Sequence, residues 1–363
     1  MAKYKLGEIC EIVSGSTPKT GIAEYWDGNL KWITPAEIDD ESYIITDSAR
    51  KLTELGVKKT GLSSFPSGTV ILSSRAPIGK VAIAGCEMYC NQGFKNLICS
   101  DRINNRYLYW FLKGNTAYLN SLGRGATFKE ISKKIVSDIE INVPEISQQL
   151  AAVDALERVS EIIRLRKNQL QKLDELIKAR FVELFGDPEL NPRGLPVLPW
   201  NAVFLTTTGK LDSNAMVENG RYPFFTCAKE SYKINSYAFD CEALLLAGNN
   251  AAGIYDVKHY KGKFNAYQRT YVLRLMNEKW SYILFKRQLE DKLQYLQSQS
   301  KGTNTRYLTL GILNELRFVV PPVAEQEQFA VFVEQTDKSK VVVQKALDEA
   351  QTLFDSLMQK YFE

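Results

Sequence analysis

The same long segment occurs twice in this chain. Residues 143–185 and 320–362 both begin with Val-Pro and end with Phe, and an offset of 177 positions aligns them without a gap. Under this offset Gln149 matches Gln326. An internal repeat must be accommodated by any fold of the chain, so two related structural units are expected.

Each copy has the pattern of one long helix. About forty residues after the opening prolines contain neither proline nor glycine, and residues of high helix propensity dominate. Apolar residues recur every seven positions in the first copy, at Leu156, Ile163, Leu170, Ile177 and Leu184. Such a repeat forms a seam for another helix. A helix of this length would span roughly 60 Å, which favours a coiled-coil spacer over a core helix of one domain.

We expect the two helices to pack antiparallel along this seam. Lys340 and Thr336 interrupt the apolar lines of the second copy, so we expect weaker packing near its start. The residues expected to pair are Ile163, Leu170, Leu173 and Ile177 of the first helix and Val343, Leu347, Ala350 and Phe354 of the second.

Two segments of mixed pattern accompany the helices. In each, one stretch has the pattern strand, loop, strand, at Gly68–Gly85 and Cys241–Val257, and a helix follows further on, at Arg106–Leu122 and Lys279–Gln297. We therefore predict an α+β fold made of two mixed α/β domains and two long antiparallel coiled-coil helices, related by a pseudo-twofold repeat. The predicted boundaries are 1–142 for the first domain, 143–185 for the first helix, 186–319 for the second domain and 320–363 for the second helix.

Composition excludes several classes of protein. A net charge of +4 and a pI of about 8.5 are too mild to establish a nucleic-acid partner without a local basic surface. No apolar run is long enough for a signal peptide or a membrane span, so we expect a cytoplasmic protein with no membrane partner. Cys86, Cys90 and Cys99 lie close together, but zinc sites usually show paired close spacings, so free thiols are the better interpretation.

Catalytic motifs are missing from the sequence. There is no phosphate-binding Gly-Lys-Ser/Thr loop, no Asn/Asp-Pro-Pro-Tyr/Phe motif of amino-methyltransferases and no Gly-x-Ser-x-Gly elbow. A single histidine, His259, leaves little material for a histidine-based triad or metal site. We therefore predict no catalytic residue, no metal and no cofactor in this chain.

Several stretches resemble one known family. They are "KLGEICEIVSGSTPKT", "WITPAEID" at Trp32–Asp39, "INVPEISQQ", "FVVPPVAEQEQ" and "LDELIKARFVELFGDP". With the tandem arrangement of domains and helices, they resemble the specificity subunit of type I restriction–modification enzymes over essentially the whole chain.

The resemblance implies a non-catalytic DNA-binding subunit. Each domain would be a target-recognition domain that reads one half of a bipartite site in double-stranded DNA, and the helices would fix the unread spacer. Two methyltransferase subunits, which carry S-adenosylmethionine, and a motor-nuclease subunit would be its partners.

Phosphates are contacted by Lys, Arg and small polar residues, and bases by Arg, Lys, Asn or Gln on protruding loops. Arg75 and Asn249 are favoured as DNA contacts because each lies three residues past an equivalent strand leucine. The candidates in the first domain are Lys19, Arg75, Lys80, Lys95, Arg124 and Lys129, and those in the second are Lys210, Lys229, Asn249, Asn250, Arg269, Lys301 and Arg306.

Two other functions stay open. A coiled-coil adaptor that binds only protein would share the long helices but would not bind DNA. A stand-alone enzyme would need a catalytic constellation that the sequence does not offer.

Overall fold

The computed structural model describes residues 2–75, 77–125, 129–251 and 253–362. It divides into two compact units. The first comprises Met1–Lys167 and Lys345–Glu363, and the second comprises Asn168–Gln344. Each unit therefore contains one part of each long helix, a division that differs from the predicted series of separate domains and helices.

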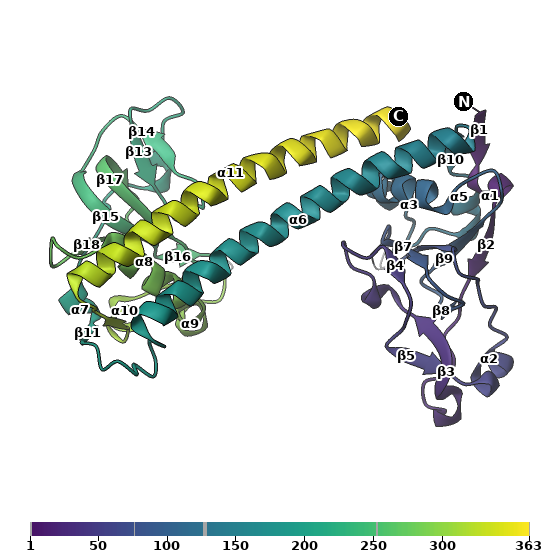
Figure 1. Ribbon diagram of the computed structural model, residues 1–363, viewed down its shortest axis with the longest axis horizontal. Helices are drawn as coiled ribbons and strands as arrows, with labels where there is room; N and C mark the ends of the chain where they lie inside the picture. The colour runs from purple at the N-terminus through teal and green to yellow at the C-terminus, as the bar shows by residue number, and fades with distance from the viewer. Residues whose placement is uncertain (1, 76, 126–128, 252, 363) are drawn as a thin grey trace. The chain divides into compact units, whose positions relative to one another are not determined.

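Within the described residues, the strands of the first unit form three sheets (Figure 1). They are β1 (Ala2–Lys5), β2 (Cys10–Ser14), β3 (Trp26–Ile33), β4 (Ile44–Ile45), β5 (Arg50–Leu52), β6 (Val70–Leu72), β7 (Val81–Ala84), β8 (Tyr89–Cys90), β9 (Lys95–Cys99) and β10 (Glu140–Val143). The main sheet has five strands in the order β2-β9-β6-β7-β4, the second has the order β5-β3-β8, and β1 pairs with β10.

Short helices cover the sheets of the first unit. They are α1 (Leu6–Ile9), α2 (Glu54–Thr60), α3 (Asn105–Gly114), α4 (Thr116–Ser121) and α5 (Lys133–Ser137), with 3₁₀ turns η1 (Ala23–Tyr25) and η2 (Pro35–Glu37). Helix α3 packs on β6 and β7 and carries a run of buried residues from Tyr107 to Leu112. Its N-cap, Asn104, accepts hydrogen bonds from the first backbone N–H groups of the helix, which fixes where α3 begins.

The second unit has a similar plan. Its strands are β11 (Val197–Pro199), β12 (Phe204–Thr208), β13 (Tyr222–Phe225), β14 (Tyr232–Ile234), β15 (Phe239–Ala247), β16 (Asn249–Asn250), β17 (Val257–Ala266), β18 (Thr270–Leu275), β19 (Arg306–Tyr307) and β20 (Arg317–Val319). Its shorter helices are α7 (Trp200–Val203), α8 (Tyr282–Asp291), α9 (Leu293–Gln299) and α10 (Leu310–Asn314), with the 3₁₀ turn η3 (Ser213–Ala215).

Sheet order confirms the internal repeat beyond the helices. The main sheet of the second unit has the order β12-β18-β15-β17-β13-β14, and β11 pairs with β20. The first four strands correspond to β2-β9-β6-β7, and the pair β11-β20 corresponds to β1-β10. The two units diverge in the strands added beyond this shared core.

The long helices are α6 (Ile146–Phe185) and α11 (Val323–Phe362), each of 40 residues. In the second unit Lys340 of α11 pairs with Asp174 of α6 at 2.6 Å. Further along α6, Ile177 shares a buried cluster with Val333, which lies earlier on α11. Since positions rise along one helix as they fall along the other, the two helices run antiparallel in this unit.

In the first unit the last turns of α11 lie beside the first turns of α6, close to α3 (Figure 1). Ile163 of α6 is buried in one cluster with Leu347, Ala350 and Phe354 of α11. The ring of Phe354 lies 5.6 Å from that of Trp110 in α3. The end of α11 is thus held by both α6 and the domain.

The expected pairing is met in part. Ile163 packs with three of the four residues expected of the second helix. Ile177 instead packs with Phe329 and Val333, because the partner of each successive α6 residue lies closer to the start of α11 in an antiparallel pair. Of the other expected residues, Val343 is buried, whereas two are only partly buried: Leu170 and Leu173.

The two polar residues that interrupt the apolar lines of α11, Lys340 and Thr336, both have bonding partners. Lys340 keeps about a quarter of its side chain exposed and binds Asp174 and Asp337, at 2.6 and 3.2 Å. Thr336 is buried, and its hydroxyl donates to the carbonyl of Phe332, at 2.9 Å. Among the described residues, none of the helices has an apolar stretch long enough to cross a membrane.

Candidate nucleic-acid interface

Three backbone segments of the first unit meet beyond the end of β6. The carbonyl of Ser74 accepts a hydrogen bond from the N–H of Ile131 at 2.9 Å. Arg124 and Glu130 exchange two backbone hydrogen bonds of 3.0 Å, and Arg75 forms a β-bridge with Glu130. We call these five residues the first platform. Its bonded backbone gives Arg75 and Arg124 a fixed base.

The second unit repeats this arrangement. The carbonyl of Gly248 accepts a hydrogen bond from the N–H of Leu308 at 2.8 Å. Lys301 and Tyr307 exchange backbone hydrogen bonds of 3.1 and 2.8 Å, and Asn249 pairs with Tyr307 in the β16–β19 ladder. We call these five residues the second platform.

Arg75 and Asn249 hold equivalent positions on the two platforms, since each bridges to the central residue of the paired segment. Both side chains are partly exposed. An arginine fork matches the O6 and N7 acceptors of guanine, and an asparagine amide matches the N6 and N7 groups of adenine. The two platforms therefore present different base-reading chemistry from one backbone arrangement.

The second platform gathers most of the candidates expected in its unit. The N–H of Gly248 donates to the carbonyl of Arg269 at 2.8 Å, which places Arg269 beside the platform. Asn250 pairs with Arg306 in the ladder of β16 and β19. The exposed Lys210 lies on a neighbouring loop, where the carbonyl of Leu211 accepts a hydrogen bond from Gln268 at 2.9 Å.

Lys229 is exposed on the loop after β13, where the carbonyl of its neighbour Ala228 accepts a hydrogen bond from Lys258 at 2.8 Å. No backbone bond on this loop joins it to the residues of the second platform within the described chain. The loop instead meets the neighbouring Arg269 through the thiol of Cys227, which donates to the carbonyl of Arg269 at 3.5 Å.

The first platform gathers most of the candidates expected in its unit as well. Lys129 is exposed and directly precedes Glu130, and residues 126–128 lie outside the described chain. The ammonium group of Lys80 donates to the carbonyl of Pro35 at 3.0 Å. Lys19 is exposed, and its own carbonyl accepts a hydrogen bond from the indole N–H of Trp26 at 3.3 Å. Lys80 ends the loop between β6 and β7 that also carries Arg75, and its backbone N–H donates to Ser73 Oγ at 2.8 Å, whereas Lys19 lies on a different loop, between β2 and η1.

Lys95 requires a correction. Its side chain is only 8% exposed, and its Nζ lies 3.3 Å from both Glu130 Oε1 and Ser74 Oγ. Its side chain reaches from β9 to the side chains of two platform residues. This burial and pairing are not those of a direct phosphate contact, so the expected role of Lys95 at the DNA surface is not supported.

The two central residues, Glu130 and Tyr307, were not among the candidates from sequence. They lie at matching positions of the 177-residue repeat and directly precede the matched pair Ile131 and Leu308. The 177-residue offset of the repeat was the sequence signal that could have identified these two positions. An acidic side chain is repelled by DNA phosphates, and a loop tyrosine is not specific to DNA binding. Residue type alone therefore does not identify Glu130 or Tyr307.

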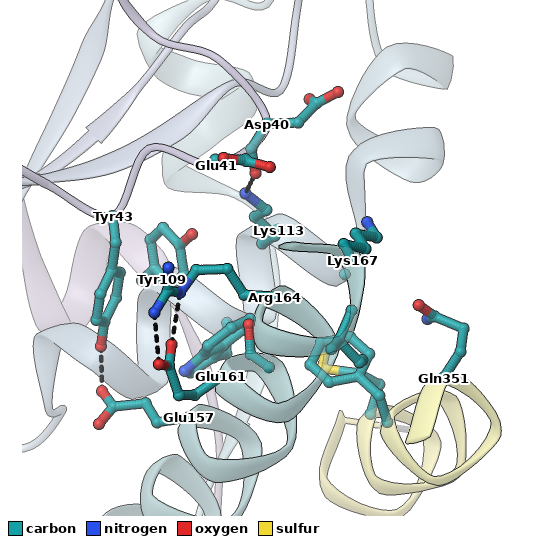
Figure 2. Close-up of a pocket in the computed structure, with 16 residues that line it drawn as sticks. Asp40, Glu41, Tyr43, Tyr109, Lys113, Glu157, Glu161, Arg164, Lys167 and Gln351 are labelled. Atoms are coloured by element: carbon teal, nitrogen blue, oxygen red, sulfur yellow. Dashed lines mark hydrogen bonds and ion pairs between the residues drawn. The ribbon is translucent and has the colours of Figure 1, made fainter. Parts of the chain in front are cut away.

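A cavity of about 570 Å³ lies in the first unit, between the 40–43 loop, α3 and the two long helices (Figure 2). Its apolar wall includes Trp110, Phe354 and Met358. The indole N–H of Trp110 is buried and has no hydrogen-bond partner among the described residues.

The charged rim of this cavity is largely paired with itself. Figure 2 shows the hydroxyl of Tyr43 donating to Glu157 and the guanidinium of Arg164 bonded to Glu161. Burial, together with the Glu157 hydrogen bond, raises the pKa of Tyr43, so its hydroxyl stays protonated as a donor. These bonds occupy part of the rim, and the apolar wall is the part of the cavity suited to an apolar side chain of a partner.

Metal-binding chemistry is not apparent in this structure. Within residues 2–75, 77–125, 129–251 and 253–362, His, Cys, Asp and Glu form no cluster of three suited to a metal ion. The cysteines described there are all free thiols.

The sequence matches the model of one protein family over both units. The family is described as the type I restriction modification DNA specificity domain, and the matched residues are 1–175 and 203–350. Among curated proteins, the type I restriction enzyme MjaIX specificity subunit of Methanocaldococcus jannaschii is 30% identical, over 98% of this chain and 91% of that protein. The EcoDI specificity subunit of Escherichia coli is 40% identical over 38% of this chain and 30% of that protein.

Solved structures share the fold. The S subunit of a type I restriction-modification system from M. genitalium covers all of this chain and 96% of its own, with a TM-score of 0.64 at 15% identity. A structure describing complex assembly and conformational transition of the type I R-M system covers 99% of this chain and 97% of its own, with a TM-score of 0.55 at 17% identity. The family match over both units, and an identity that extends along nearly the whole chain, show that this chain belongs to the type I restriction–modification DNA specificity family and is a non-catalytic specificity subunit.

Proposed function

We propose that each compact unit reads one half of a bipartite site in double-stranded DNA through its platform. The observation that carries this proposal is the equivalence of Arg75 and Asn249 on two matching backbone arrangements. Reading two different half-sites requires the same presentation with different side chains, and this pair satisfies both conditions. Arg124 and Lys301, which occupy matching repeat positions and are both exposed, would contact phosphates and set the register.

We further propose that two methyltransferase subunits bind the long helices. Leu165 and Val342 are 50% and 69% exposed and lie 177 positions apart, at the same place in the repeat. Leu176 and Leu353, 47% and 51% exposed, form a second such pair. Exposed apolar surface on a helix is available to a partner protein. The repetition of these exposed residues in each unit favours two copies of one partner over a single partner.

The partners would supply the chemistry that this chain lacks. We propose that the methyltransferase subunits carry S-adenosylmethionine and transfer the methyl group, and that a motor-nuclease subunit joins them for cleavage. This chain would select the site, and, because the target of the assembly is DNA, we place the assembly in the cytoplasm. The alternative of a protein-only adaptor gains no support from the family match.

The length of α6 and α11 would set the unread spacer between the half-sites. Inserting one heptad into both helices adds about 10 Å to each, equivalent to roughly three base pairs. We expect the spacer in the methylated motif to lengthen while both half-sites stay the same. An unchanged spacer with efficient methylation would mean that the helices do not measure the gap.

The half-site proposal can be tested by sequencing the DNA methylated by the complete complex. Arg75→Ala and Asn249→Ala would each be expressed with the partner subunits, with Lys59→Ala on the exposed face of α2 as a control for loss of a surface charge. We expect Arg75→Ala to relax one position in one half-site and Asn249→Ala to relax one position in the other. Motifs unchanged in both variants would refute the assignment of the platforms as base readers.

A further inference from the structure

The first platform contains an ion-pair network that the second lacks. Glu130 Oε1 lies 3.3 Å from the ammonium group of the buried Lys95, while Glu130 Oε2 faces Arg75 Nη1 at 4.0 Å. The ammonium group of Lys95 also donates to Ser74 Oγ, at 3.3 Å. One carboxylate therefore faces a buried cation on one side and a partly exposed arginine on the other.

The second unit places neutral groups at the same points. Lys95 pairs with Ser14 at one end of the β2–β9 ladder, and Tyr271 pairs with Thr208 at the same end of the β12–β18 ladder. The Tyr271 hydroxyl donates to the carbonyl of Leu308 at 3.0 Å.

Tyr307 holds the central position that Glu130 holds in the first unit. The shared backbone arrangement is therefore compatible with neutral side chains at both positions. The acid and the lysine of the first platform are a feature of that unit alone, and they accompany Arg75 in place of Asn249.

Burial dictates how the network is ordered. A buried ammonium group is costly unless it is paired and hydrogen-bonded, so Lys95 holds the near oxygen of Glu130. With this oxygen held by Lys95, the other oxygen of the carboxylate faces Arg75. The guanidinium has five N–H donors. Nη1 of Arg75 lies 4.0 Å from Glu130, and a guanidinium held on one side by a carboxylate has further donors to offer to a base edge.

We propose that Glu130 is a positioning residue for base reading, which orients the guanidinium of Arg75 and is itself oriented by the buried Lys95. This inference rests on the proposed function of the first platform. Glu130 acts through Arg75 and does not touch DNA. The second unit needs no such residue, because the shorter Asn249 side chain has fewer rotatable bonds to fix.

The test separates positioning from mere structural support. Glu130→Gln keeps the shape of the side chain but leaves the buried Lys95 unpaired, so it weakens both folding and positioning. The double variant Lys95→Met/Glu130→Gln also removes the buried charge and should regain thermal stability. Glu11→Gln, an exposed acid on β2, serves as the matched control. All variants are prepared in complex with the methyltransferase subunits, and both melting temperature and the methylated motif are measured.

We expect Glu130→Gln and the double variant both to lose about tenfold in discrimination at one position of one half-site, with the other half-site intact. That position should be the one that Arg75→Ala relaxes. Recovery of discrimination together with stability in the double variant would overturn the inference, because it would show that Glu130 only supports the fold. If Arg75→Ala relaxes a position and Glu130→Gln does not, the inference fails while the proposed function stands. If Arg75→Ala changes no position, the proposed function of this platform fails as well.

Discussion

Gln149 and Gln326 have two hydrogen bonds in common, at matching places in the two units. Each side chain is fully buried. Gln149 accepts a bond from the N–H of Asn104, the N-cap of α3, at 2.8 Å, and donates to the carbonyl of Pro144 at 2.8 Å. Gln326 accepts from Ser281, the N-cap of α8, at 2.9 Å, and donates to Pro321 at 2.8 Å. The start of each long helix is therefore tied to a helix of its own unit.

Replacing either glutamine by alanine should lower the free energy of unfolding by about 1–3 kcal/mol, because the N-cap N–H and the proline carbonyl would be left buried without partners. Urea unfolding of Gln149→Ala and Gln326→Ala measures the effect. Gln335→Ala, at an exposed position of α11, is the control. Losses no larger than that of the control would show that these bonds do not anchor the helices.

The repeat made much of this fold predictable from sequence. Helices without proline or glycine and with a seven-residue apolar line have few alternatives, and the observed helices begin and end within a few residues of the expected boundaries. The partner of Ile177 was misplaced because a periodic seam fixes the face of a helix but leaves its register with a partner open. The burial of Lys95 was missed because a strand lysine gives no sign of the acid, distant in sequence, that pairs with it.

Two neighbouring residues of α6 should separate helix pairing from partner binding. Ile163 is 9% exposed and packs against α11, whereas Leu165 is 50% exposed. Ile163→Asp should therefore destabilise the first unit by about 3 kcal/mol or more, since it buries a charge without a partner. Leu165→Asp should change stability by roughly 0.5 kcal/mol or less. Thermal unfolding of the two variants makes the comparison, and equal losses would mean that Leu165 is covered within the chain.

The exposed pair Leu165 and Val342 should control how many methyltransferase subunits bind. We expect Leu165→Asp and Val342→Asp each to leave one subunit bound, and the double variant to leave none, because a charge placed in an apolar interface must be desolvated. The mass of the assembled complex measures the number directly. Leu55→Asp in α2, which is also at an exposed apolar position, controls for the added charge. Two subunits retained by the double variant would exclude this surface.

The Lys340–Asp174 pair should give a pH-dependent contribution to stability. Burial alone would lower the pKa of Lys340, but hydrogen bonds to Asp174 and Asp337 outweigh it and raise the pKa above its ordinary value. A raised folded-state pKa means that the contribution is fully present below the unfolded pKa of about 10.4 and is lost as the pH rises through the folded value. Because Asp174 is 61% exposed, we expect only about 0.5–1 kcal/mol.

The contribution of the Lys340–Asp174 pair is measured by comparing the free energies of unfolding in urea of the wild type and Lys340→Met, at pH 7 and at pH values above 10.5. The difference between the two proteins should shrink or change sign at high pH, since the methionine fits the apolar seam and does not titrate. Lys345→Met, on the exposed side of α11, should show a smaller difference with little dependence on pH. A constant difference for Lys340→Met would mean that the ion pair adds nothing to the helix packing.

A change of base preference is the most direct test of the second platform. Asn249 and Arg75 occupy equivalent positions, so Asn249→Arg places the side chain of the first platform on the second. Because asparagine matches adenine and arginine matches guanine, one position of one half-site should shift from adenine towards guanine, with a preference of about 1–3 kcal/mol. The second platform has Tyr307 where the first has Glu130, so no acid orients the new arginine. We therefore expect it to discriminate between bases less sharply than Arg75 does. Methylation of a library randomised over both half-sites measures the shift. A motif weakened at every position, with a changed salt dependence, would assign Asn249 to phosphate contact instead.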